Sequence, residues 1–238
     1  MIRTVLCCVT ITAMLASGAA CGGAEEPRPQ PLKHHFDEQH IAQVGMDEKQ
    51  AMLQAQNEYH RAKAEKMKAE ADHADVVNKL ELAKNEKKRA EISKDSAGKQ
   101  KSAASESGDT TRMNAAMRDD RVAELGLRAA DQRVDTLNAR KRWLEKLIRY
   151  TEENTYAAEA KYELAKARLA KQHNIAPRGF AFQAYVDQHE ERSRRAQRSK
   201  LIADREREKW QAEEKDYQAK RAESDRARGV DTTAKGSK

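Results

Sequence analysis

The chain has 238 residues, of which 36% are charged, 38% are hydrophobic and only 5% are aromatic, and its formal net charge is +7. So many charges and so few aromatic rings argue against a large globular core, and they are typical of coiled coils and long helices or of disordered chains. The sequence has no Gly-rich phosphate loop, nucleophile elbow or HExxH motif, so we expect no enzyme activity and no cofactor.

Residues 1–20 have the pattern of a secretory signal peptide. One basic residue, Arg3, precedes an apolar run that ends in small residues, which is the usual order of the parts of such a signal. The run is too short for a comfortable transmembrane span, which needs about 20 residues. The sequence therefore predicts export, with cleavage before Cys21.

Residues 15–21, which read LASGAAC, resemble the lipobox of bacterial lipoproteins. That family cleaves before the Cys and acylates its thiol and new amino group, so the resemblance implies that Cys21 anchors the chain in a membrane. No Asp follows Cys21, which resembles the members sent to the outer membrane. Gly18 stands where the family prefers Leu, and an ordinary signal peptidase would cut the same bond and leave a free thiol.

Cysteine usage also favours lipidation. Cys7 and Cys8 lie in the signal peptide, so Cys21 is the single Cys of the expected mature chain. It has no intramolecular partner for a disulfide, and an odd Cys in a secreted protein calls for another role. We therefore predict acylated Cys21 at the mature N-terminus, facing the periplasm.

A tether and a first helix follow. In residues 21–35, Pro27, Pro29 and Pro31 favour an extended, semi-rigid spacer between lipid and folded body. The group of His34, His35 and His40 comes next, but its spacing does not give a helical i,i+4 pair, so we expect a solvated helix start and no metal site.

Two long helices are predicted at 36–94 and 112–173, joined by a Ser-, Gly- and Lys-rich flexible loop at 95–111. Their similar length favours an antiparallel hairpin whose arms each span about 90 Å. The first helix repeats small residues every seven positions: Ala55, Ala62, Ala69, Val76, Ala83 and Ala90. The second helix carries a longer seam: Leu127, Ala130, Val134, Leu137, Leu144, Ile148, Ala158, Tyr162, Ala165 and Leu169. Seams of this length indicate coiled coil rather than disorder.

A turn at 174–180, with Pro177 and Gly179, is followed by a charged helix at 181–228 and a disordered tail at 229–238. The predicted fold class is all-α: a long antiparallel coiled-coil hairpin with a third, loosely packed helix. Trp143 lies 34 residues before Pro177 and Trp210 lies 33 residues after it. We therefore predict that the two rings pack together, the alternative being that Trp143 is an exposed anchor for a partner.

The basic charge is mostly interleaved with acids, and the densest group, Arg192, Arg194, Arg195, Arg198 and Lys200, is flanked by Glu and Asp. We interpret this pattern as a solvated helix face. The aromatic residues lie mostly on seams, and an exported protein rarely meets nucleic acid, so we expect no nucleic-acid partner.

These features together predict a lipid-anchored periplasmic spacer or scaffold of the bacterial cell envelope that acts through protein–protein contacts. One alternative is a tether from the outer membrane to peptidoglycan through the C-terminal tail. The chain resembles the murein lipoprotein in overall plan only, with a lipobox Cys, heptads and a terminal Lys238. A second alternative is a periplasmic holdase chaperone. Partner identity and oligomeric state stay open.

Overall fold

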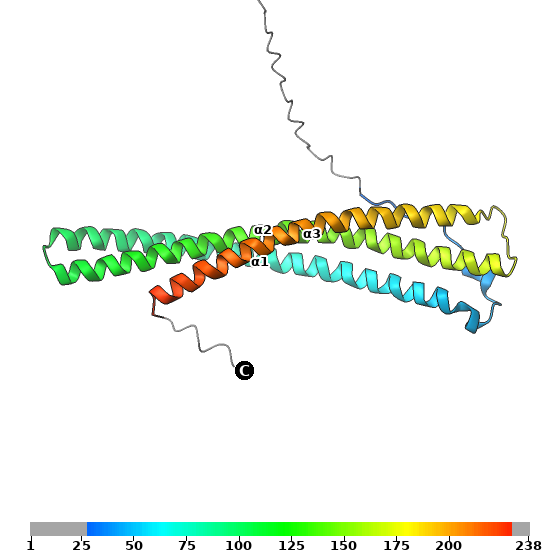
Figure 1. Cartoon of the computed structure of the whole chain (residues 1–238), viewed down its shortest axis with the longest axis horizontal. Helices are drawn as coiled ribbons and strands as arrows, with labels where there is room; N and C mark the ends of the chain where they lie inside the picture. The colour runs from blue at the N-terminus through cyan, green and yellow to red at the C-terminus, as the bar shows by residue number, and fades with distance from the viewer. Residues whose placement is uncertain (1–27, 230–238) are drawn as a thin grey trace, which may run out of the picture.

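The computed structural model describes residues 28–229, and this part of the chain is all-helical, with three packed helices and no strand (Figure 1). The helices are α1 (Gln50–Glu106), α2 (Thr110–Gln172) and α3 (Phe182–Ala227). Two short 3₁₀ helices, η1 (Glu38–Ile41) and η2 (Met46–Lys49), precede them. None of these helices is long and apolar enough to span a lipid bilayer. The predicted signal peptide, Cys21 and Lys238 lie outside the described residues.

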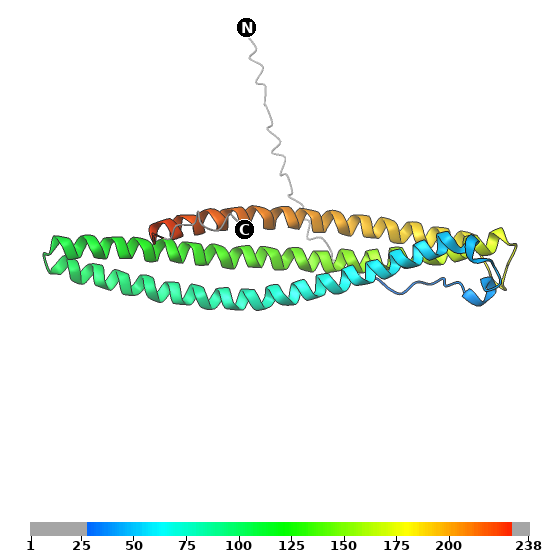
Figure 2. The same ribbon diagram turned by 90° about the horizontal axis from the view of Figure 1, so that it is seen from below.

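Helix α2 is the central helix, with α1 along one side and α3 along the other (Figure 2). Ion pairs join α1 to α2 in opposite numerical order, from Glu58–Lys161 through Lys87–Asp131 to Lys94–Asp120. Helix α1 has 57 residues and α2 has 63, so they extend for about 85 and 95 Å at about 1.5 Å per residue.

The α1–α2 contact is made largely by the predicted small residues. Ala55, Ala62, Ala69, Val76 and Ala83 are buried. Because these side chains are short, the two helix backbones can approach closely along the whole row. The same seven-residue step continues to two further buried residues, Ala97 and Ala104.

That continuation corrects the predicted loop at 95–111. Helix α1 runs to Glu106, and the connection consists of Ser107, Gly108 and Asp109 only. Gly108 adopts φ +68°, which suits glycine, and the Asp109 side chain accepts hydrogen bonds from the backbone of Thr111 and Arg112. The Ser- and Lys-rich composition predicted flexibility, but alanines spaced by seven residues give this segment a face to bury.

The predicted start of the first helix at residue 36 is also wrong. Residues 37–49 form η1, η2 and turns, and α1 begins at Gln50. Phe36 and Ile41 are buried in the end of the rod, in an apolar cluster that also contains Tyr162 and Leu169. Burying both side chains there requires the chain to turn, which a straight helix from residue 36 would prevent.

The α2–α3 contact is more polar than the α1–α2 contact. Gln132 and Thr136 of α2 are buried there, and both bond to Glu213 of α3: Gln132 Nε2 donates to the carboxylate at 2.6 Å and Thr136 Oγ1 donates to the main-chain oxygen at 3.0 Å. Lys220 donates to Gln132 Oε1 at 2.7 Å. Fixed polar pairs therefore set the alignment of α3 on α2.

Candidate functional site

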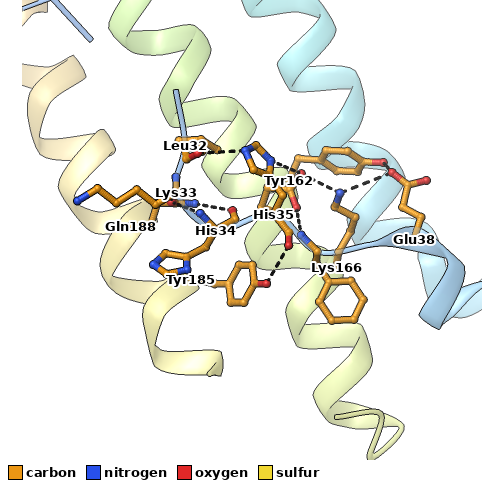
Figure 3. A network of polar contacts seen from close by, with 11 residues as sticks. Leu32, Lys33, His34, His35, Glu38, Tyr162, Lys166, Tyr185 and Gln188 are labelled. Atoms are coloured by element: carbon orange, nitrogen blue, oxygen red, sulfur yellow. Dashed lines mark hydrogen bonds and ion pairs between the residues drawn. The ribbon is translucent and has the colours of Figure 1, made fainter. Parts of the chain in front are cut away.

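The N-terminal strap, residues 28–36, lies against α2 and α3 near the end of the rod where those two helices are joined (Figure 3). It contains no helix or strand and bends at Lys33, and Pro29, Leu32 and Phe36 are buried. Side chains of α3 meet it on one side, and Tyr162 and Lys166 of α2 lie on the other. The site is thus a surface of α2 and α3 that is covered by a peptide of the same chain.

Polar side chains of α3 bond to the strap backbone on successive helical turns. Arg192 donates to the carbonyl of Gln30 at 2.7 Å. The Gln188 amide accepts from the main-chain nitrogens of Lys33 and His34, both at 2.9 Å, and donates to the carbonyl of His34 at 3.0 Å.

The Tyr185 hydroxyl extends this row by donating to the carbonyl of His35 at 3.1 Å. As the strap numbers rise, the numbers of their partners in α3 fall, so the strap runs antiparallel to α3. Because these bonds reach main-chain atoms, α3 holds the strap through its backbone rather than through its side chains.

A buried ion pair of α2 completes the site. Glu163 accepts the main-chain N–H of Phe36 at 2.7 Å and pairs with Lys166 at 2.7 Å, and the two side chains are each only 6% exposed. A buried carboxylate without such partners would be costly. The strap therefore takes part in neutralising and solvating the charge of Glu163.

Tyr162 ties the start of η1 to the same network. Its hydroxyl donates to Glu38 at 2.6 Å, and Lys166 lies 3.6 Å from Glu38. Burial, together with the hydrogen bond to Glu38, raises the pKa of Tyr162 well above its usual range. The phenol therefore stays protonated and acts as a hydrogen-bond donor at neutral pH.

Aromatic rings pack together at the Phe36 end of the strap. The Phe36 ring meets Phe180 edge-on with a centroid distance of 5.7 Å, and it meets Tyr185 at 6.4 Å. Phe36 and Tyr185 belong to a buried apolar cluster that also contains Ile41 and Leu169, and the partly buried Phe180 packs against it. The chemistry of the site suits firm retention of a peptide.

This arrangement differs from the predicted free tether at 21–35, because residues 28–35 are docked on the helices. Sequence reasoning missed Glu163, Tyr185, Gln188 and Arg192 as strap partners. The available signal was the presence of apolar Leu32 and Phe36 in a segment otherwise polar and proline-rich, since a free linker has no reason to carry them.

The two tryptophans lie together, as their nearly equal distances from Pro177 along the sequence predict. The rings of Trp143 and Trp210 stack with centroids 4.8 Å apart and planes 3° from parallel. The guanidinium of Arg140 lies 5.4 Å from the centre of the Trp210 ring. Stacked rings and a nearby cation join α3 to the middle of α2.

The histidines near the strap make separate contacts. The ring of His35 is hydrogen-bonded to the carbonyl of Leu32 at 3.1 Å and lies 3.7 Å from Glu163. His34 packs against the Tyr185 ring, and His40 against Phe36. Within residues 28–229, no group of three or more His, Cys, Asp or Glu side chains is placed to hold a metal ion.

Comparison with protein-family models, with curated proteins and with solved structures gave no match for this chain.

Proposed function

We propose that this protein is a lipid-anchored spacer or scaffold of the bacterial cell envelope, facing the periplasm and acting through protein–protein contacts rather than catalysis. In this proposal, acylated Cys21 sits in the outer membrane. Helices α1 and α2 form an antiparallel coiled-coil hairpin, and α3 reinforces it. The exposed faces of α1 and α3 are available to partners.

The observation that best supports a mechanical role is the docked strap. Only residues 22–27 separate Cys21 from the first described residue, and they extend at most about 25 Å. Arg192, Gln188 and Glu163 then fix the strap to two helices. An anchored Cys21 would therefore hold the rod itself, and not only a flexible leader, close to the membrane.

The anchoring is tested by fractionating cells that produce the wild-type chain or Cys21→Ser. We expect the wild-type protein in the membrane fraction and the variant in soluble or unprocessed form. Globomycin, which blocks lipoprotein signal peptidase, should cause unprocessed wild-type protein to accumulate. Membrane association of Cys21→Ser equal to wild type would contradict the proposal. Mild crosslinking in native cells, followed by identification of the linked proteins, tests the scaffold role.

The peptidoglycan-tether alternative is favoured by where α3 ends. From Arg192, beside the strap, α3 continues for 35 residues to Ala227, or about 53 Å. Helix α3 therefore ends far from the strap, and Lys238 lies 11 residues further along the sequence. Sacculi boiled in detergent and then digested with lysozyme decide a covalent link. Complete removal by detergent, or an unchanged bound fraction after deletion of Lys238, would exclude it.

A further inference from the structure

The face of α1 that points away from α2 carries a second apolar row, which we call the outer seam. It consists of Ala64, Met67, Ala71, Ala74, Leu82 and Ile92, together with Asn78 and Asn85, and every member is exposed. Its three large apolar side chains are strongly exposed: Met67 and Ile92 are each 69% exposed and Leu82 is 60% exposed. These are three of the seven large hydrophobic side chains exposed in residues 28–229.

The spacing of the outer seam is that of a coiled-coil contact. From Met67 to Ile92 the steps alternate between three and four residues, with one extra step of four between Asn78 and Leu82 and with Arg89 at one position. A row of this spacing lies along one side of a helix and fits the side of another helix. Helix α2 covers the opposite side of α1, and α3 lies beyond α2 (Figure 2). The seam is thus a helix-binding face that the described chain leaves open.

The outer seam is complementary to itself when two copies run antiparallel with Asn78 on the two-fold axis. Pairs whose residue numbers sum to 156 then face each other. Leu82 falls opposite Ala74, and Ile92 falls opposite Ala64. Two of the three large apolar side chains thereby meet small ones, as close helix packing requires, and Met67 falls opposite Arg89. Asn78 meets its own copy, and a paired Asn in an apolar seam is a common means of fixing register.

Charges beside the seam support the same alignment. In antiparallel coiled coils, flanking residues on the same edge of the two helices face each other. On one edge this places Glu70 against Lys88 and Lys63 against Asp95, and on the other edge it places Lys68 against Glu86. All three pairs have opposite charge.

A parallel pair of α1 helices would have the reverse effect. In that orientation, a flanking residue on one edge approaches the residue five positions later on the partner. Lys63 would then approach Lys68, and Glu70 would approach Asp75. Like charges disfavour this arrangement, so the flanks select the antiparallel one.

We propose that a second copy of this chain binds the outer seam, so that the protein forms an antiparallel homodimer through α1 about a two-fold axis at Asn78. The contact from Ala64 to Ile92 is about 42 Å long. The inference goes beyond the envelope role proposed above and does not depend on Cys21 being acylated.

Cysteine crosslinking tests the orientation. In a chain whose three native cysteines are replaced by serine, Met67→Cys is oxidised alone and also mixed with Arg89→Cys. The antiparallel dimer places these two positions opposite each other, so the mixture should form the disulfide and Met67→Cys alone should not. A strong Met67→Cys homodimer would indicate the parallel orientation and overturn the proposal.

Sedimentation equilibrium of the purified chain tests whether the outer seam is the dimer contact. Leu82→Glu should raise the dimer Kd at least about tenfold, because it places unpaired carboxylates in the seam. Leu201→Glu is the matched control, since Leu201 is 61% exposed on α3, and it should leave Kd unchanged. Circular dichroism verifies that both variants keep their helices. A wild-type chain that stays monomeric at high concentration, or equal effects of the two variants, would overturn the proposal.

Charge reversal distinguishes specific charge pairs across the dimer from nonspecific association. Glu70→Lys and Lys88→Glu should each weaken the dimer, and the double variant should recover affinity, since it restores opposite charges across the axis. Failure of the double variant to recover would contradict this alignment.

Discussion

The two ends of the rod differ in what holds them together. Where α2 is joined to α3, the strap, three helices and several aromatic rings, including Phe36 and Tyr185, share one apolar cluster. Where α1 is joined to α2, only two helices meet. The buried apolar residues there are Ala97, Ala104 and Ala116. The buried carboxylate of Asp120 accepts hydrogen bonds from Lys94 at 2.5 Å and from Lys101 at 2.9 Å. The two ends of one continuous helix can therefore differ widely in local stability.

Phe36→Ala should have the largest effect, because it removes a ring from the centre of the strap end. We expect a loss of about 3–4 kcal/mol in the free energy of unfolding, measured by urea denaturation. Hydrogen exchange should rise in the strap and in the adjoining turns of α2 and α3, with little change near Ala104. Leu201→Ala, on an exposed surface, should change stability by less than about 0.5 kcal/mol. Equal increases in exchange at both ends would refute the contrast.

Lys166→Ala should also weaken the strap end strongly. It leaves the buried carboxylate of Glu163 without its cationic partner, at an expected cost of about 3 kcal/mol. The double variant Glu163→Gln/Lys166→Met should be more stable than Lys166→Ala, because no buried charge remains. If Lys166→Ala lowers the free energy of unfolding by no more than an exposed Lys→Ala substitution does, the Glu163–Lys166 ion pair does not stabilise the strap end.

Ala104→Gly tests the end where α1 is joined to α2, because the buried side chains there are small and their removal costs little packing. We expect a loss of about 1 kcal/mol, mainly because glycine disfavours the helical backbone. Hydrogen exchange should increase near residues 97–116 while the strap stays protected. Ala212→Gly, at an exposed position of α3, is a control for helix propensity alone. Loss of strap protection in Ala104→Gly would show that the ends are coupled.

Lowering the pH should also affect the stability of the two ends differently, but by less than the substitutions above. Burial, with Arg168 and Lys161 nearby, lowers the pKa of His189 at the strap end. Because the folded pKa is the lower one, this stabilisation is present above the unfolded pKa of about 6.5 and is lost as pH falls through the folded pKa.

At the end where α1 is joined to α2, Lys94 and Lys101 lower the pKa of Asp120. The stabilisation from Asp120 persists above about pH 4 and is lost only below it. Between pH 7 and 5, His189→Gln should therefore lose less stability than wild type, while Asp120→Asn should follow wild type. Burial raises the pKa of Glu159, so protonation of Glu159 opposes the effect of His189 as the pH falls. The contribution of His189 is therefore read from the difference between the variants and wild type, and not from the wild-type slope. Identical slopes for wild type and His189→Gln would contradict the assignment.

Periodicity predicted what repeats along the helices. The buried row from Ala55 to Ala83 follows from seven-residue spacing, and the Trp143–Trp210 stack follows from counting outward from Pro177. The charged helix predicted at 181–228 differs by only one residue at each end from α3. These features depend on local spacing, which the sequence displays directly.

The strap site could not be predicted in this way, because it joins residues more than 120 positions apart, such as Phe36 with Glu163. Its partners are isolated polar side chains in helices already full of polar residues, so Gln188 looks like any solvated Gln. The helical segment 95–106 was missed for a related reason, since composition concealed the spacing of Ala97 and Ala104. Sequence patterns therefore predict the helices better than they predict which residues contact each other across the fold.

The direction of the strap gives the protein unequal resistance to pulling. Bonds from Arg192, Gln188 and Tyr185 follow one another along the strap. A force on residue 28 directed along the rod, away from the α2–α3 connection, loads these bonds together in shear. A force perpendicular to the rod peels them one after another, starting at Gln30. A protein held at its N-terminus would therefore withstand tension along its axis far better than tension across it, and single-molecule pulling in the two geometries would measure the ratio.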